Sequence, residues 1–235
     1  MPMKRKMLSY IFSVFILCSF INASSQESLD YRVVGPRIGF DVSRLALFYL
    51  EPGRVNFELS GDLEIRELNY YAVLEVGWQQ IDFEGKNYNY SSGGLYGRLG
   101  LDYNFLNLQS PDDYEMLYAG GRYGYSRFNH QADQIIITEN YWGEYQTSVP
   151  KDWVNAHWLE LIVGIKAELS KNLFIGWDIR GKFLLHKSGN GVMDPYNIPG
   201  FGNGSRRVAI GFSYTVAYRI PVTRKRVTIN FQNPE

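Results

Sequence analysis

Cysteine is almost absent from this sequence of 235 residues. The single cysteine, Cys18, lies inside an apolar run near the N-terminus. A disulfide needs two cysteines, so a disulfide-stapled scaffold is excluded. If the N-terminal run is removed as a secretory signal, the mature chain contains no cysteine and its stability owes nothing to disulfides.

An excess of charge of one sign is also absent. The sequence has 24 Lys and Arg residues and 24 Asp and Glu residues, so its formal net charge is zero. Nucleic-acid-binding domains usually carry a basic patch or stripe. No such excess is visible here, and we expect no nucleic-acid partner.

The sequence has one prominent apolar run near its start, residues 7–21, which is short for a membrane-spanning helix. It follows the positive residues 4–6 and precedes the small residues 23–25, which is the order of a cleaved secretory signal. We therefore exclude residues 1–25 from the fold. A lipid anchor on Cys18 is the weaker alternative, because this cysteine lies within the apolar core of the signal.

Aromatic residues, by contrast, are abundant, with 18 Tyr and 14 Phe, and they favour β-strands. Residues 158–169 show the clearest pattern, because apolar and mostly polar or charged side chains alternate along them. This period of two is typical of a strand with two different faces. The same pattern predicts eight strands, at 36–44, 54–66, 70–83, 94–106, 115–128, 156–169, 173–186 and 206–220.

The links between the predicted strands alternate in length. Short links follow the second, fourth and sixth strands, at 67–69, 107–114 and 170–172. Longer links rich in Gly, Asn, Tyr and Pro follow the third, fifth and seventh, at 84–93, 129–155 and 187–205. Short turns at one end and long loops at the other are typical of an outer-membrane barrel. With the N-terminus on the periplasmic side, the long loops face the outside of the cell.

Over the middle of the predicted strands, charged residues lie on one face. There the opposite face, which includes Phe40, Trp78, Leu99 and Trp177, contains no ionised residue. The charged set holds seven positive and nine negative residues: Arg37, Asp41, Glu58, Asp62, Glu64, Glu75, Arg98, Asp102, Arg122, Glu160, Lys166, Glu168, Asp178, Arg180, Lys182 and Arg219. One face of every strand is therefore apolar, and the other carries charge.

Two architectures fit this division of faces. A soluble barrel places the apolar face inside, and a membrane barrel places it outside. An eight-stranded barrel has little interior volume, and the apolar set is too bulky for it, whereas the glycines among the charges suit a crowded lumen. We predict an all-β fold, an eight-stranded antiparallel up-and-down transmembrane β-barrel over residues 26–222, with a short basic periplasmic tail at 223–235.

The pattern resembles a known family. The signal peptide, the eight alternating strands and the aromatic last strand, Phe212 to Ile220, resemble the small OmpA/OmpX-type outer-membrane barrels. The run Gly39 to Arg44 and the turn Tyr49 to Gly53 resemble a group of barrel proteins from Bacteroidota. These resemblances imply a place in the cell outer membrane and contact with its lipid, but they imply no specific role and no cofactor.

The inward charges nearly balance, and this favours a lumen filled by salt bridges over an open pore. Buried charges must pair, and removing one partner of a buried pair typically costs about 3 to 5 kcal/mol. A conducting pore needs more width than eight strands give, and usually a charge bias of one sign. We keep a narrow pore as an alternative.

Three histidines near the outer ends of the strands are candidates for a metal or base site. His130 follows the fifth strand, His157 lies at the start of the sixth and His186 ends the seventh, so all three fall near the outer ends of these strands. Alternation sends His130 and His186 inward and His157 outward, and no HxxxH spacing is present. We therefore expect no metal, cofactor or enzymatic activity. A rim-site lipid-modifying enzyme remains an alternative.

Aromatic residues in the longest loop, 129–155, are candidates for contact with a partner: Tyr141, Trp142, Tyr145 and Trp153. They could equally pack on neighbouring loops. The sequence favours a non-enzymatic outer-membrane barrel with a structural, adhesive or scaffolding role through its extracellular loops. The alternative is an accessory subunit of an outer-membrane assembly or export complex, in contact with another outer-membrane protein.

Overall fold

Eight antiparallel strands close into a barrel in the computed structural model of this chain. The structure describes residues 31–44, 51, 53–65, 69–85, 88–106, 110, 112–139, 143–189 and 193–226. The barrel strands are β2 (Arg37–Asp41), β3 (Arg54–Ile65), β4 (Tyr70–Glu84), β5 (Asn89–Asn104), β6 (Met116–Glu139), β7 (Gly143–Ser170), β8 (Leu173–Lys187) and β11 (Val208–Arg219). Each pairs with the next along the chain, and β11 pairs with β2 to close the ring.

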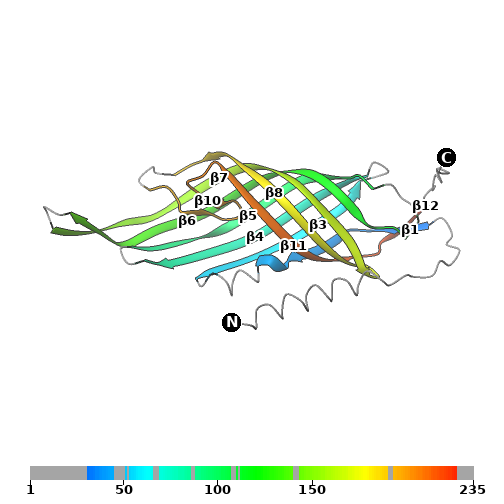
Figure 1. The fold of residues 1–235 in the computed structure, drawn as a ribbon, viewed down its shortest axis with the longest axis horizontal. Helices are drawn as coiled ribbons and strands as arrows, with labels where there is room; N and C mark the ends of the chain where they lie inside the picture. Colours follow the sequence, from blue (N-terminus) through cyan, green and yellow to red (C-terminus); the bar gives the residue numbers. More distant parts are fainter. Residues whose placement is uncertain are drawn as a thin grey trace, which may run out of the picture.

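The predicted all-β fold with eight antiparallel up-and-down strands is confirmed (Figure 1). The proposed signal peptide, residues 1–25, lies outside the described residues. In the described part of the chain, no helix combines the length and apolar character needed to cross a membrane.

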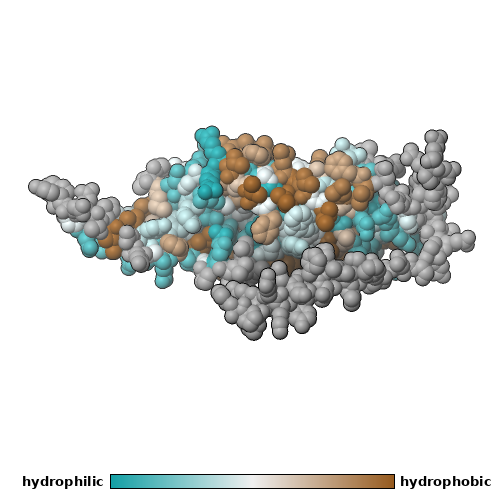
Figure 2. Space-filling view, viewed as in Figure 1, coloured by the Kyte–Doolittle hydropathy of each residue, from teal (hydrophilic) through white to brown (hydrophobic). Residues whose placement is uncertain are grey.

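Alternation along each strand separates an apolar outer wall from a charged interior. Leu95 is 66% exposed and Leu161 is 65% exposed, whereas Arg98 and Glu160, on the same two strands, are each 1% exposed. Apolar side chains gather over the middle of the barrel wall in Figure 2, with hydrophilic residues toward its ends. The predicted assignment of the two faces therefore matches the structure at the centre of the barrel.

Two of the predicted long links are mostly strand. The β4–β5 link is residues 85–88 rather than 84–93, because β5 begins at Asn89 and pairs with the end of β4. The 129–155 link is occupied largely by the outer ends of β6 and β7, which pair as far as Glu139 and Gly143. These two strands extend beyond the rest of the barrel as a hairpin (Figure 1). Residues 134–139 and 143–150 are called the arm below.

Two short strands that the alternation did not predict join the ends of the barrel domain. β1 (Tyr31–Val34) pairs antiparallel with β12 (Thr223–Arg226), so the first residues of the expected basic tail form a ladder. Lys225 also lies 3.8 Å from Glu64, at the end of β3. Residues 227–235 of the tail lie outside the described residues.

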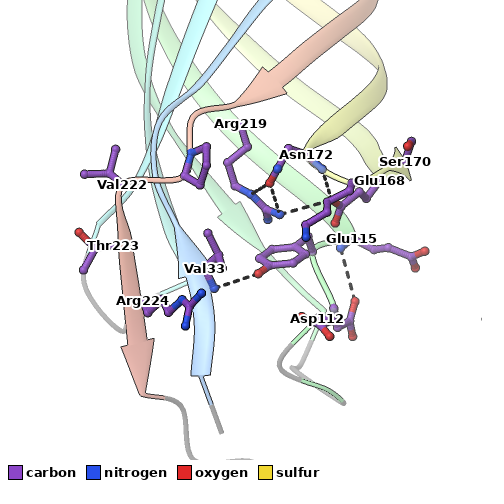
Figure 3. Close-up of a pocket in the computed structure, with 14 residues that line it drawn as sticks. Val33, Asp112, Glu115, Glu168, Ser170, Asn172, Arg219, Val222, Thr223 and Arg224 are labelled. Carbon is purple, nitrogen blue, oxygen red and sulfur yellow. Dashed lines mark hydrogen bonds and ion pairs between the residues drawn. The ribbon is translucent and has the colours of Figure 1, made fainter. Parts of the chain in front are cut away.

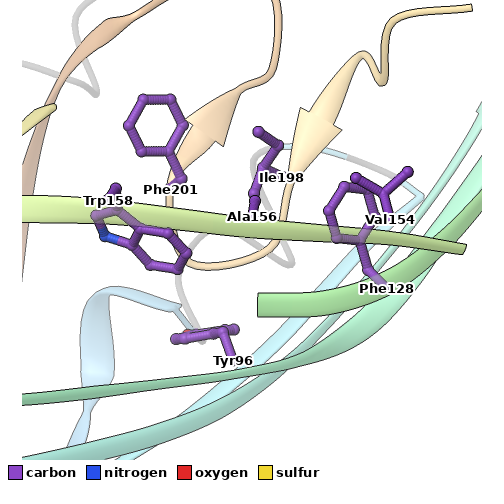
Figure 4. Close-up of a cluster of buried hydrophobic side chains, with 7 residues drawn as sticks. All are labelled: Tyr96, Phe128, Val154, Ala156, Trp158, Ile198 and Phe201. Carbon is purple, nitrogen blue, oxygen red and sulfur yellow. The ribbon is translucent and has the colours of Figure 1, made fainter. Parts of the chain in front are cut away.

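The interior changes character along the barrel axis. Its outer end holds an apolar cluster of Tyr96, Phe128, Val154, Ala156, Trp158, Ile198 and Phe201 (Figure 4). Ile198 and Phe201 belong to the β8–β11 connection, around the two-residue strands β9 (Asn197–Ile198) and β10 (Gly202–Asn203). This connection therefore folds into the barrel mouth. We call residues 195–204 the plug loop.

Glycine makes room for the largest side chain in this cluster. A Cβ on Gly124 would lie 2.2 Å from the Trp158 ring, whereas a Cβ on Gly121, on the outer face of the same strand, would meet only the Glu160 carbonyl oxygen at 3.9 Å. A side chain at position 124 would therefore compete with the indole for the same space.

Gly124→Ala should destabilise the barrel by about 1 to 3 kcal/mol, because overpacking forces neighbouring side chains out of position. Gly121→Ala is the matched control on β6 and should change stability little. Denaturant unfolding of both variants in detergent micelles measures the difference. Equal stability of the two variants would contradict the packing described for Trp158.

Candidate functional site

A network of buried ion pairs fills the middle of the barrel, and Glu75 lies at its centre. Its carboxylate is 3.1 Å from Arg98, 3.1 Å from Arg180 and 3.8 Å from Arg122. These groups come from β4, β5, β6 and β8, so one carboxylate links half of the barrel wall. All four side chains are buried.

Further carboxylates complete the central group. Arg98 contacts Glu58 and lies 3.5 Å from Glu160. Arg180 lies 3.4 Å from Glu160 and 2.9 Å from Asp178. Because each guanidinium meets at least two carboxylates, no arginine in this group is left without a counter-charge, as buried charges require.

Two more ion-pair groups lie closer to the short-turn end. Asp62 pairs with Arg37 at 2.5 Å and with Lys166 at 2.6 Å. Arg122 reaches Asp102 through two bonds of 2.7 and 2.9 Å, the bidentate geometry that makes such pairs strong. Of the predicted lumen residues on β2 to β7, only Asp41, Glu64 and Glu168 lie outside these ion-pair groups.

Asp41, the last residue of β2, contacts Arg44, which is close to it in the chain, and residues of β11, the strand that pairs with β2. It accepts hydrogen bonds from the Ser213 hydroxyl at 2.7 Å and from the Tyr214 amide at 3.2 Å. Arg44, which the sequence analysis did not place in the lumen set, lies 3.1 Å from Asp41 and 3.5 Å from Glu58. Strand alternation missed Arg44 because Val42 to Arg44 form a helical turn, where a period of two no longer applies.

Arg219 is separate from the central network, although it was predicted as part of it. Its guanidinium lies 3.3 Å from Glu168, 2.9 Å from the Asn172 side-chain oxygen and 3.5 Å from the centre of the Tyr114 ring (Figure 3). These residues border a cavity of about 890 Å³ at the short-turn end. Burial raises the pKa of the Tyr114 phenol, which accepts a hydrogen bond from the Val33 amide.

Lys182 joins the charged interior to the plug loop. Its ammonium donates to the carbonyl oxygen of Gly200 at 2.6 Å and to that of Phe201 at 3.3 Å. The Gly200 amide in turn donates to the Gln79 side chain at 3.3 Å. A predicted lumen residue thus anchors the loop that closes the outer mouth.

The three histidines do not converge. His130 is 2% exposed inside the barrel, as alternation predicted, and His157 faces the outer wall beside Tyr123 and Tyr125. The inward prediction for His186 is wrong. A β-bulge at Leu185 shifts the register, so His186 pairs with His157 and is exposed. Within the described ranges, no three His, Cys, Asp or Glu side chains cluster closely enough to hold a metal ion.

Two of the four aromatic contact candidates can be placed. Tyr145 lies on the arm and is 67% exposed, and Trp153 lies on β7 at the base of the arm and is 53% exposed. Arg127 and Lys151 both lie over the Trp153 ring. Tyr141 and Trp142 fall outside the described residues.

Comparison with known families gives one match that spans nearly all of the chain. The sequence model of the Domain of unknown function (DUF6048) family matches residues 5–225. The chain belongs to the DUF6048 family. Comparison with curated proteins found no match.

Two solved structures resemble this DUF6048 protein in overall shape. One is a major outer membrane protein from Thermus thermophilus, with 12% identity and a TM-score of 0.46, aligned over 82% of this chain and 100% of that chain. The other is Neisserial surface protein A (NspA), with 10% identity and a TM-score of 0.34, aligned over 83% of this chain and 100% of that chain. At these values the likeness says nothing of a shared role.

Glu75→Gln should destabilise the barrel strongly, by about 3 to 5 kcal/mol, because it leaves three buried arginines short of one negative charge. Glu84→Gln on the same strand is the matched control, since Glu84 is exposed. Unfolding in urea, followed by tryptophan fluorescence in micelles, measures both. A loss below about 1 kcal/mol for Glu75→Gln, far less than breaking a buried pair costs, would show that Glu75 is not the centre of the network.

Proposed function

We propose that this protein is an integral barrel of the cell outer membrane, without enzymatic activity or a conducting pore, which acts as a structural, adhesive or scaffolding protein through its outer end. Residues 26–222 form the barrel and residues 1–25 the signal that directs it there. No cofactor is required for this role.

The apolar outer wall is the observation that carries the proposal. Exposed Leu, Ile, Val and aromatic side chains surround the closed barrel, while its charges lie inside. In water this arrangement would leave a large apolar surface exposed, far beyond what monomeric soluble proteins show. In a bilayer the same surface meets hydrocarbon, and closure of the ring satisfies the backbone groups of the strands.

The filled interior supports a role without conduction. Ion pairs occupy the middle of the lumen, and the plug loop with Phe201 and Ile198 occupies the outer end. Small eight-stranded barrels have room for little beyond their own side chains. The filled lumen therefore contributes rigidity, and contacts with other molecules are made by the outer wall and the two ends of the barrel.

The arm is the best-placed surface for a partner. The first residue of β5 lies opposite Asp133, and the last residue of β8 lies opposite Ala156. Within the described residues, the arm therefore has no neighbouring strand on either side. The β6–β7 ladder uses the backbone groups between its two strands, and in the described part of the chain those along the two outer edges are available to an added strand, which is a common mode of peptide recognition. The exposed Tyr145 would add side-chain contact.

A role as accessory subunit of an outer-membrane complex is the second candidate, and the short β2 favours it. β2 pairs with only Leu59–Asp62 of β3 and Thr215–Arg219 of β11. In the described part of the chain, Arg54–Glu58 and Val208–Tyr214 therefore lack a ladder partner across this seam. A strand of another barrel could pair with these free edges at membrane depth.

The folded protein should migrate faster on SDS gels before boiling than after it, because a closed, ion-paired barrel resists detergent. It should also fractionate with outer membranes and give no stepwise conductance in planar bilayers. A soluble periplasmic protein without a mobility shift would overturn the membrane assignment. Regular conductance steps would overturn only the plugged lumen.

A photoreactive amino acid at position 145 should cross-link to another protein in intact cells, whereas the same group at position 171, in the turn at the opposite end, should not give that product. Adducts would be detected as a shift on gels and identified by mass spectrometry. Absence of any adduct from position 145, together with adducts from the outward-facing position 57 or 210 beside the β2 seam, would favour the accessory-subunit role instead.

A further inference from the structure

A groove of about 680 Å³ lies on the outer wall, across β4 to β7 on the side of the arm. The strand register places its lining in neighbouring rows. Trp78 lies opposite Leu95, and Leu95 opposite Arg127. In the next row toward the arm, Gly93 lies opposite Asn129, which lies opposite Trp153.

Gly93 creates the hollow at the centre of this groove. It lacks a side chain between Gln80 and Asn129, its cross-strand neighbours. A Cβ at position 93 would meet atoms of Gln79 and Gln80 only at 3.7 Å or more, which is ordinary contact. A larger side chain is therefore sterically allowed here, and its absence leaves space that an outside molecule can occupy.

Two cations border the groove beside an indole ring. Arg127 lies 5.4 Å from the centre of the Trp153 ring, and the Lys151 ammonium lies 6.0 Å from it. In the residues that the structure describes, neither forms a salt bridge. Asp82, on β4, accepts hydrogen bonds from Gln80 at 2.8 Å and from Ser91 at 2.7 Å, and Asp133, on β6, accepts one from Gln131 at 3.4 Å. Neither carboxylate forms an ion pair with Arg127 or Lys151, so both cations are available to an anion from outside.

The apolar belt begins directly below these cations. Leu95 is 66% exposed and Trp78 is 39% exposed, and the next outward rows continue with Val76, Leu74 and Leu99. A ligand in the groove would thus meet positive charge and indole at one end and a hydrocarbon-facing wall at the other. A free anion would use only the first of these surfaces.

We propose that this groove binds the phosphorylated headgroup of a membrane lipid, with phosphate between Arg127 and Lys151 and acyl chains along Leu95 and Trp78. The inference rests on the proposed membrane location and adds a defined lipid site to it. Arg and Lys near a membrane surface each contribute about 1 kcal/mol toward anionic lipid, and the Trp rings suit the interface.

Native mass spectrometry of the delipidated full-length protein tests the proposal, with dioleoyl phosphatidic acid as the probe and dioleoylglycerol and inorganic phosphate as comparisons. Arg127→Gln combined with Lys151→Gln should weaken phosphatidic acid binding roughly 10- to 30-fold. Gly93→Val should also weaken it by filling the hollow. Lys171→Gln combined with Arg224→Gln, at the opposite end, removes the same charge and should bind like the unchanged protein.

Equal binding by the two double variants would overturn the groove as a lipid site. Competition by inorganic phosphate at the same affinity would show an anion site in place of a lipid site, and equal binding of dioleoylglycerol would show that the phosphate is not recognised. Each variant is first checked for the mobility shift on boiling. If the unchanged protein lacks that shift, the membrane assignment itself fails, which is distinct from loss of lipid binding by a barrel that remains folded.

Discussion

Pairing of charge inside a narrow closed wall is the constraint on which this structure depends. The outer face is apolar along its whole middle, so the charges of the strands have no place except the interior. There a lone carboxylate or guanidinium would be very costly. Glu75 meets three arginines and Arg98 meets three carboxylates, so charges from six strands stabilise one another. The apolar wall and the ion-paired lumen therefore depend on each other.

The outer end of the lumen is filled by a different chemistry. Trp158, Phe128 and Phe201 pack where the ion pairs stop, and Lys182 bridges the two layers by binding carbonyl oxygens of the plug loop. Trp158 also donates to Glu160 at 2.6 Å, so the apolar cluster is tied to the charged layer below it. The side chains of such a filled interior have little room to rearrange. The barrel is therefore suited to present its ends and its outer wall to partners.

Strand alternation predicted the number of strands and the two faces, since a period of two is a local property that each segment carries by itself. It could not predict features set by pairing between strands. His186 was placed inside because the bulge at Leu185 is visible only in the register with β7. The plug loop was recognised as a long link rich in Gly, Asn, Tyr and Pro, but its Phe201 packs in the lumen against Trp158, whose ring occupies the space left by Gly124. The pairing of β1 with β12 joins residues nearly 200 positions apart along the chain, beyond any local pattern.

That β1–β12 ladder bears on how the ring closes. Joining β2 to β11 closes a loop that contains the other six barrel strands, and loop-closure entropy opposes it, although the cost grows only slowly with length. Once Tyr31–Val34 pairs with Thr223–Arg226, only Gly35 and Pro36 on one side and residues 220–222 on the other separate the ladder from β2 and β11. Backbone bonds from Ile220 to Pro36 and from Val222 to Val34 bridge this gap. With the ladder in place, the pairing of β2 with β11 is a short-range step, and the long-range contact between the two ends of the chain is made by the ladder itself.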